Sequence, residues 1–385
     1  MAIGHVTSDH AAARARVTGP APSAIPQLLE LLDERLGGQS AAVVMYFASI
    51  AYDPDDLVGP ITDHFPGAQV IGCSTAGEFT DDATGSGGIS AIALPDVVVA
   101  RCAAVLGELE TDVARGADFA VRDIEAQLGG RLKALDPASH IGVVLIDGLH
   151  GAEELLTAQV RAAAPNLQLI GGSAGDDLAF ERTWVAVGKL FSWNAVALLV
   201  AEIGVAFQVV KTCSFAPTGI KLRITSAEPG TRTVEEFDGK PAVQAYADAL
   251  GTSPDAVDES LFMSNPVGLM VDGEPWIRSP QAPTPGGGLK FYSEITEGTE
   301  VELMHSTDLL GDTEAAVADA VDAVGGTASG AVMFNCILRR LELDAKGESR
   351  EFVAAFGGVP MAGFHTYGET WRGHVNQTLT GVVFG

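Results

Sequence analysis

The chain has 385 residues, of which 50 are Asp or Glu and 23 are Lys or Arg, so its formal net charge at pH 7 is −27. This acidic excess argues against nucleic acid or an anionic membrane surface as the main partner, because both attract basic protein surfaces. Hydrophobic residues make up 47% and charged residues 19%, which is typical of a folded chain with an apolar core. At about 150 residues per domain, the length favours two or three domains.

The cysteines and the N-terminus indicate where the chain resides. The four cysteines lie far apart and match neither a zinc motif nor a disulfide framework, which favours a reducing compartment. Residues 1–17 contain no apolar segment of the kind that a secretory signal needs. The longest uncharged apolar run, 195–201, is too short to cross a bilayer. We expect a cytoplasmic protein without a membrane anchor.

The first part of the chain mixes helix and strand signals. Residues 26–36 repeat leucine with helical spacing and end at two glycines, which predicts a helix. The apolar runs at 41–47 and 141–146 predict strands buried on both faces. Residues 89–94 and 97–105 flank a Pro-Asp pair and predict an antiparallel hairpin.

Further elements continue the same mixture. A helix is predicted through 153–156, and strands are predicted at 195–200 and 205–210. Residues 239–251, with Pro near the start and Gly at the end, predict another helix. The Pro- and Gly-rich stretch 280–288 predicts a loop.

The pattern favours an α/β fold with partly antiparallel sheets layered against helices. The sequence A-P-T-G at 216–219 interrupts the apolar pattern. We therefore place a domain boundary near residue 216, which gives domains at 1–215 and 216–385.

A short segment recurs along the chain. Residues 72–78 (GCSTAGE) and 363–369 (GFHTYGE) share Gly, Thr, Gly and Glu in register, and 171–176 (GGSAGD) matches them with one residue deleted. Each copy follows an apolar strand by 27 to 31 residues, counted from Val44, Val144 and Val332. The sequence therefore predicts a repeated unit of strand, helix, strand and turn.

The repeated turn has the chemistry of a ligand site. Glycines allow close backbone approach, successive N–H groups bind anions, and Ser, Thr and acidic side chains add further polar groups. Such turns could hold both ends of a zwitterion, with Glu78 or Glu369 facing an ammonium group. The alternative is that the motif only ends a strand and forms a turn.

Six stretches of the chain, taken together, resemble the FIST family of signal-transduction sensors, which pair an N-terminal with a C-terminal FIST domain. They are FPGAQVIGCSTAGEF (65–79), LIDGLHGAEELL (145–156), LIGGSAGDDLAFERTWV (169–185), DGKPAVQAYA (238–247), FNCILRRLEL (334–343) and GFHTYGETWRGHVNQTLTGV (363–382). The resemblance implies a non-enzymatic sensor that binds a small ligand, such as an amino acid. It also implies signalling through a separate histidine kinase, diguanylate cyclase or chemoreceptor.

The C-terminal stretches also resemble a haem-containing, nitric-oxide-sensing subgroup. That subgroup carries a His within a K-T-x-H-F segment, where this chain has Ser214. We therefore expect no cofactor, and haem-based nitric oxide sensing is the alternative, with His374 or Cys213 as iron ligand. A scaffold that binds only protein is a third hypothesis.

The predicted ligand-binding residues are polar side chains in the repeated turns or at strand ends. They are Ser74, Thr75, Glu78, Asp147, Ser173, Asp176, Arg339, His365, Thr366, Tyr367 and Glu369. Asp147 follows a buried strand at a turn, where α/β sheets often place ligand groups, although an Asx turn explains it equally well. Arg339 suits a ligand carboxylate, or alternatively a neighbouring acidic residue.

No catalytic motif emerges. Ser74 does not lie in a G-x-S-x-G sequence, and the glycines at 85–88 lack the lysine of a phosphate-binding loop. We therefore do not expect an enzyme.

Overall fold

The computed structural model describes residues 11–109, 112–228, 230–271 and 273–385. Its mixed α/β fold, predicted from the sequence, is built from three related units and one inserted subdomain. The first ten residues, which belong to the segment expected to lack a secretory signal, lie outside this description. No helix in the described ranges is long and apolar enough to cross a membrane.

The three units follow one another in the chain and repeat the same order of elements. Unit one contains β1 (Ala13–Thr18), α1 (Ala21–Leu36), β2 (Ala41–Ser49), α2 (Pro54–His64), β3 (Gln69–Thr75), β4 (Glu78–Thr80), β5 (Thr84–Gly85) and β6 (Gly88–Pro95). Unit two contains β7 (Val99–Glu108), α3 (Val113–Leu128), β8 (His140–Ile146), α4 (Glu153–Ala163), β9 (Gln168–Ser173), β10 (Val185–Val187), β11 (Leu190–Ser192) and β12 (Ala195–Ile203). Unit three contains β13 (Phe207–Lys211), α7 (Leu309–Ala323), β22 (Gly330–Cys336), α8 (Ile337–Lys346), α9 (Ser349–Ala354), β23 (Met361–Thr366), β24 (Glu369–Trp371), β25 (His374–Val375) and β26 (Leu379–Phe384).

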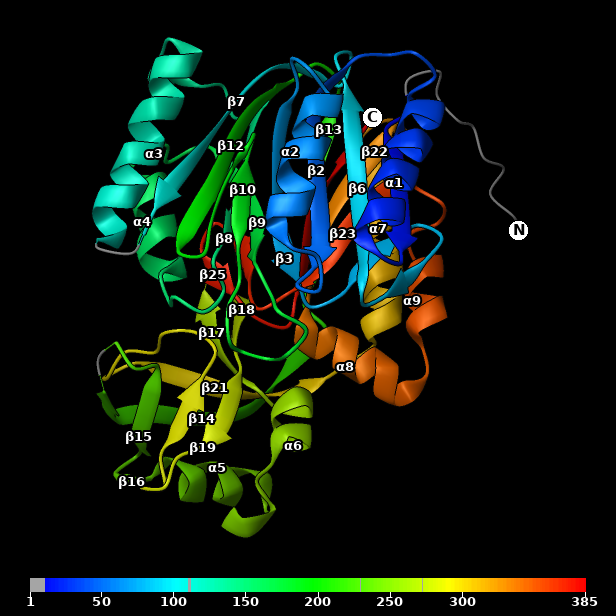
Figure 1. Cartoon of the computed structure of the whole chain (residues 1–385). Helices are drawn as coiled ribbons and strands as arrows, with labels where there is room; N and C mark the ends of the chain where they lie inside the picture. The colour runs from blue at the N-terminus through cyan, green and yellow to red at the C-terminus, as the bar shows by residue number, and fades with distance from the viewer. Residues whose placement is uncertain (1–10, 110–111, 229, 272) are drawn as a thin grey trace.

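The inserted subdomain interrupts unit three between β13 and α7, and Figure 1 shows it below the three units. It contains β14 (Phe215–Glu228), β15 (Thr233–Phe237), β16 (Lys240–Pro241), α5 (Ala242–Leu250), α6 (Glu259–Ser264), β17 (Val267–Val271), β18 (Glu274–Arg278), β19 (Pro280–Pro283), β20 (Leu289–Phe291) and β21 (Glu300–Ser306). The residue at the predicted domain boundary, Ala216, lies in β14, where this insertion begins. The division into domains 1–215 and 216–385 stays a prediction.

The repeat of strand, helix, strand and turn is confirmed. Each unit has a parallel strand pair, β2 with β3, β8 with β9, and β22 with β23. An antiparallel strand, β6, β12 or β26, flanks the first strand of each pair. The hairpins are exchanged: β4–β5 joins the sheet of unit three, β10–β11 that of unit one, and β24–β25 that of unit two. No unit therefore completes its sheet alone.

Apolar residues pack in layers around these sheets. A central core gathers inward side chains of all three sheets, including Phe47, Leu145 and Phe334. Three outer cores lie between each sheet and its own helices, and a separate core holds the inserted subdomain together. The predicted continuous apolar strands are explained, because β2, β8 and β22 are buried on both faces.

The turns after β3, β9 and β23 meet where the three units join. Three equivalent backbone hydrogen bonds of 3.1 Å connect them in a ring, from Ala76 N to His365 O, from Gly175 N to Ser74 O and from Tyr367 N to Ser173 O. Each turn donates to one neighbour and accepts from the other. We call these three segments the turn junction.

Some sequence predictions of local structure were wrong. Strands β6 and β7 do not form a hairpin, because β6 lies between β1 and β2 while β7 pairs with β12 in another sheet. The helix predicted at 26–36 is present but begins earlier, at Ala21. Pro22 is compatible with its first turn, because a backbone N–H at that position has no partner within the helix.

Two Pro- and Gly-rich stretches also differ from expectation. The loop predicted at 280–288 begins with β19, an edge strand in which proline is tolerated. The interruption at 216–219 lies inside β14, where a register shift between Pro217 and Lys221 accommodates it.

The repeated glycine has a packing reason. A Cβ atom at Gly363 would lie 2.1 Å from the carbonyl oxygen of Met333, and one at Gly72 would lie 2.4 Å from the ring of Tyr46. The backbone oxygen cannot move without breaking the parallel pair of β22 and β23.

We expect Gly363→Ala to reduce the free energy of unfolding by about 1–3 kcal/mol, because the added methyl group overpacks the core. Chemical denaturation measures this change. The control is Gly130→Ala, at an exposed position after α3, where a Cβ atom meets nothing within 4 Å and no proline follows. Equal stability of Gly363→Ala and the unchanged protein would contradict the packing argument.

Candidate functional site

A cleft of about 430 Å³ lies between unit two and the inserted subdomain. The loop after β8 and the start of α4 form one wall, and the segments around Arg232 and β20 form the other. It is lined by Gly148, Leu149, His150, Gly151, Glu153, Phe180, Gly230, Thr231, Arg232, Gln281, Lys290, Phe291, Tyr292 and Tyr367. Its size and mixture of aromatic and charged groups suit a small polar ligand.

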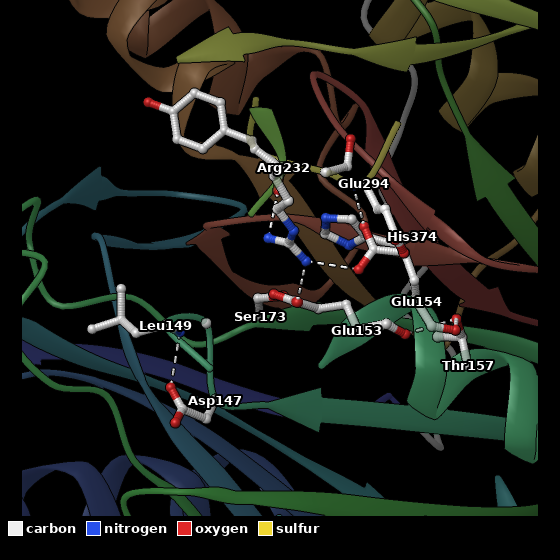
Figure 2. A network of polar contacts seen from close by, with 12 residues as sticks. Asp147, Leu149, Glu153, Glu154, Thr157, Ser173, Arg232, Glu294 and His374 are labelled. Carbon is white, nitrogen blue, oxygen red and sulfur yellow. Dashed lines mark hydrogen bonds and ion pairs between the residues drawn. The ribbon is translucent and has the colours of Figure 1, made fainter. Parts of the chain in front are cut away.

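Arg232 connects the two walls. Its Nη2 lies 2.7 Å from Glu153 Oε2 and 2.7 Å from Glu154 Oε2, both at the start of α4. Its Nη1 donates to the carbonyl oxygen of Tyr292 at 2.7 Å, and Glu294 N donates to Glu154 Oε1 at 2.7 Å. Figure 2 shows the guanidinium between the two carboxylates. We call these three charged side chains the Arg232 clamp.

The position of Glu153 and Glu154 in the first turn of α4 stabilises their negative charges. The N-cap residue, Ala152, provides no capping side chain, so acidic groups in the first turn interact favourably with the positive end of the helix dipole. Only 2% of Glu153 is exposed, and Arg232 is the ion-pair partner of this buried carboxylate. Burial opposes ionisation of Glu154, but His374 and Arg232 beside it lower the pKa of this carboxyl group below its usual value.

Two predicted site residues, Asp147 and Ser173, do not line the cleft but form hydrogen bonds to groups that do. Asp147 Oδ1 accepts hydrogen bonds from Leu149 N at 2.9 Å and from the hydroxyl of Thr183, which shapes the loop after β8. Burial raises the pKa of Asp147 above its ordinary value, although both hydrogen bonds favour the charged form. Ser173 Oγ donates to Glu153 Oε1 at 3.1 Å, and so helps to orient this carboxylate.

Tyr367 is the predicted residue that lines the cleft itself. Its ring stacks on Phe180 at a centroid distance of 5.0 Å. Its hydroxyl donates to Asp176 Oδ1 at 2.5 Å and accepts from Leu178 N at 2.8 Å. Asp176 Oδ2 also accepts from Glu181 N at 2.6 Å, so Asp176 organises the loop before β10.

This position of Asp176 corrects the third copy of the repeat. In the sheets, Glu78 pairs with Phe364 and Glu369 with Gly172, and the equivalent residue opposite Cys73 is Val185. Asp176 therefore does not correspond to the two glutamates, because unit two has a longer loop before its hairpin.

The other polar residues of the repeated motif lie buried at the turn junction. Thr75 Oγ1 donates to Glu78 Oε1 at 2.6 Å, and Thr366 Oγ1 makes the matching bond to Glu369. Ser74 Oγ accepts from Trp184 N at 3.0 Å. These contacts support the alternative that the motif shapes a turn, and their ligand-binding role stays a prediction.

His365 and Arg339 share one neighbour. The side chain of Asn335 lies 3.0 Å from His365 Nδ1 and accepts from Arg339 Nε at 2.8 Å. Burial lowers the pKa of both groups. Arg339 also donates to Thr313 Oγ1 at 2.7 Å and to Ser214 Oγ at 3.2 Å, so Ser214 holds this buried arginine.

His374 lies beside Glu154 of the Arg232 clamp. It is buried, and its Nδ1 has no hydrogen-bond partner among the described residues. Cys213 is half-buried near the beginning of β14. Haem ligation by either residue stays a prediction.

The sequence did not identify Arg232, Glu153, Lys290 or Tyr292 as site residues. The one available signal was the pair Glu153 and Glu154 at the start of a predicted helix, directly after a strand and a turn. Arg232, Lys290 and Tyr292 come from the insertion, and no local pattern relates them to that helix.

The buried glutamates of the turn junction predict a dependence of stability on pH. Burial raises the pKa of Glu78 and of Glu369 to about 7, against about 4.3 in an unfolded chain. Between these values the folded state binds more protons, so its stability falls as pH rises from about 5 to 8. We expect Glu78→Gln with Glu369→Gln to flatten this fall in melting temperature, because Gln resembles the protonated acid.

The control for this measurement is the double variant Glu314→Gln with Glu351→Gln, which removes the same charge from exposed positions. An identical pH profile for the buried and the exposed double variants would contradict the assignment.

Removal of the cation from the clamp gives a second prediction. Arg232→Gln leaves Glu153 and Glu154 without their ion-pair partner, which we expect to cost about 3 kcal/mol of unfolding free energy. Adding Glu153→Gln to this variant should recover part of the loss. Denaturation of the single and double variants measures both effects, and additive losses would show that the pair is not coupled.

Comparison with known proteins identifies the family. A family model described as the FIST N domain matches residues 42–240, and one described as the FIST C domain matches residues 242–372. An uncharacterized protein of Methanocaldococcus jannaschii is 25% identical over 360 aligned positions, which cover 83% of this chain and 69% of that protein. A crystal structure of chorismatase aligns with 97% of this chain and 98% of its own, at 12% identity and a TM-score of 0.33, which is too low to support an argument. FIST domains are associated with sensing in signal transduction, and this chain belongs to the FIST family.

Proposed function

We propose that the chain is a non-enzymatic cytoplasmic sensor that binds a small zwitterion, such as an amino acid, in the cleft between unit two and the inserted subdomain. The observation that carries this proposal is the Arg232 clamp, which places opposite charges at the boundary between two bodies of the fold. A ligand in the cleft contacts both bodies at once.

The cleft offers groups for each end of an amino acid. Lys290 is exposed on its wall and supplies a cation for a carboxylate. Glu153 supplies an anion for an ammonium group, and the stacked rings of Phe180 and Tyr367 supply an apolar surface. A zwitterion has no net charge, so the acidic chain does not repel it at long range.

The clamp provides a route from binding to signalling. An ammonium group that approaches Glu153 competes with Arg232, and this shifts the balance of contacts between α4 and the inserted subdomain. Arrangements with a loosened clamp are then favoured in the bound state. A partner such as a histidine kinase, a diguanylate cyclase or a chemoreceptor would detect the new arrangement of the two bodies.

Thermal unfolding in the presence of individual amino acids tests ligand binding. A ligand at 100 times its Kd is expected to stabilise the folded protein by about 2.7 kcal/mol. We expect Lys290→Gln to reduce the affinity about tenfold and to leave the stability without ligand nearly unchanged, because this side chain is exposed.

The matched control is Lys133→Gln, which removes an exposed lysine that does not line the cleft and should bind as the unchanged protein does. The proposal fails if no amino acid stabilises folded protein from which carried-over ligand has been removed. It also fails if Lys290→Gln binds the ligand as tightly as Lys133→Gln.

A further inference from the structure

A second pocket lies on another side of unit two. It has a volume of about 360 Å³ and is bounded by the C-terminal turn of α4, the segment entering β9, strand β13 and the tip of the β24–β25 hairpin. None of its lining residues lines the cleft described above. It is therefore a separate candidate site.

Two arginines from different elements line this pocket. Arg161 lies in the last turn of α4, and Arg372 lies at the tip of the β24–β25 hairpin. Both are exposed, and the ten described residues that line the pocket include no Asp or Glu. In a chain with a net charge of −27, a pocket with two cations and no carboxylate in its lining is a strong local reversal of charge.

Arg372 packs against the neighbouring tryptophan. Its guanidinium lies 4.9 Å from the ring centroid of Trp371, and its φ of 55° is in the left-handed region, which most residues other than glycine avoid. Lys211 Nζ lies 4.4 Å from the same ring centroid and pairs with Glu274 at 2.9 Å, outside the pocket lining. The indole therefore positions the guanidinium of Arg372 at this edge of the pocket.

The remainder of the lining is mixed. Asn166 and Gln168 are polar, and Pro137, Pro165 and Val209 offer apolar surface. A pocket of this volume holds more than a simple anion, which leaves room for an uncharged portion of a ligand.

We propose that this pocket binds a small phosphomonoester, with the phosphate between Arg161 and Arg372 and the organic group against the apolar surface. A phosphate carries about two negative charges and three acceptor oxygens, enough for two guanidinium groups that each donate two hydrogen bonds. A single carboxylate has only two oxygens and suits one guanidinium. The site lies apart from the proposed amino acid cleft, and its occupancy does not depend on that function.

The pocket also touches the inserted subdomain through its tryptophan. The rings of Trp371 and Trp276, which lies in β18, are 5.6 Å apart between centroids. The side chain of Trp371 thus connects Arg372, which would bind the phosphomonoester, with Trp276 of the insertion.

Nuclear magnetic resonance of the full chain with phenyl phosphate as probe tests this site. The chain has four tryptophans, so the indole N–H signal of Trp371 can be assigned with Trp371→Phe. We expect this signal to shift in a saturable manner. The signal of Trp193, which packs against Arg182 at 4.6 Å, serves as the internal control and should not follow the same curve.

Variants then test the two arginines. Arg161→Gln and Arg372→Gln should each weaken binding of phenyl phosphate about tenfold, because each removes charge-assisted hydrogen bonds. Arg182→Gln, the matched control, should bind with unchanged affinity. Melting temperatures of all variants verify that they are folded.

Three outcomes would overturn the proposal. Equal or linear responses of Trp371 and Trp193 would show only nonspecific association of the anion. Full affinity in Arg161→Gln and Arg372→Gln would remove the proposed phosphate contacts. Equal affinity for benzoate or phenol would show that the pocket does not select a phosphate.

Discussion

The ring of backbone hydrogen bonds at the turn junction is the constraint on which the rest of the fold depends. Each turn must present an N–H to one neighbour and a carbonyl oxygen to the other, so each of the three units depends on both of its neighbours. The exchanged hairpins reinforce this dependence, because every sheet takes its last strands from another unit. The small and polar residues of the repeated motif are thus accounted for by backbone geometry, and the buried threonine and glutamate pairs satisfy one another within it.

The candidate site arises where this symmetry is broken. Unit three is interrupted by the inserted subdomain, and unit two has a longer loop before its hairpin. Both departures line the same cleft, where Arg232 from the insertion contacts Glu153 and Glu154 at the start of α4. The same glutamates would be unfavourable at this degree of burial without that cation. The Arg232 clamp is therefore a contact through which conformational coupling between unit two and the inserted subdomain can act.

Much of the architecture could be predicted from the sequence, because apolar runs such as 41–47 and 141–146 identify buried strands. The repeat was visible through Gly72, Gly171 and Gly363, which share a steric requirement beside the neighbouring strand. The pairing of strands was harder, since β6 and β7 are adjacent in sequence but belong to different sheets. The cleft was missed because its two walls lie some 80 positions apart, as with Glu153 and Arg232, and ion pairs across such distances leave no local pattern.

The central claim is that ligand recognition takes place at the Arg232 clamp and that the turn junction is structural. Hydrogen–deuterium exchange of the full chain, with and without the amino acid that stabilises it most, tests this claim directly. We predict altered exchange in 148–156 and 230–233, which form opposite walls of the cleft, and unchanged exchange in 73–79 of the turn junction. Protection of 73–79 with no change in the two cleft segments would contradict the account.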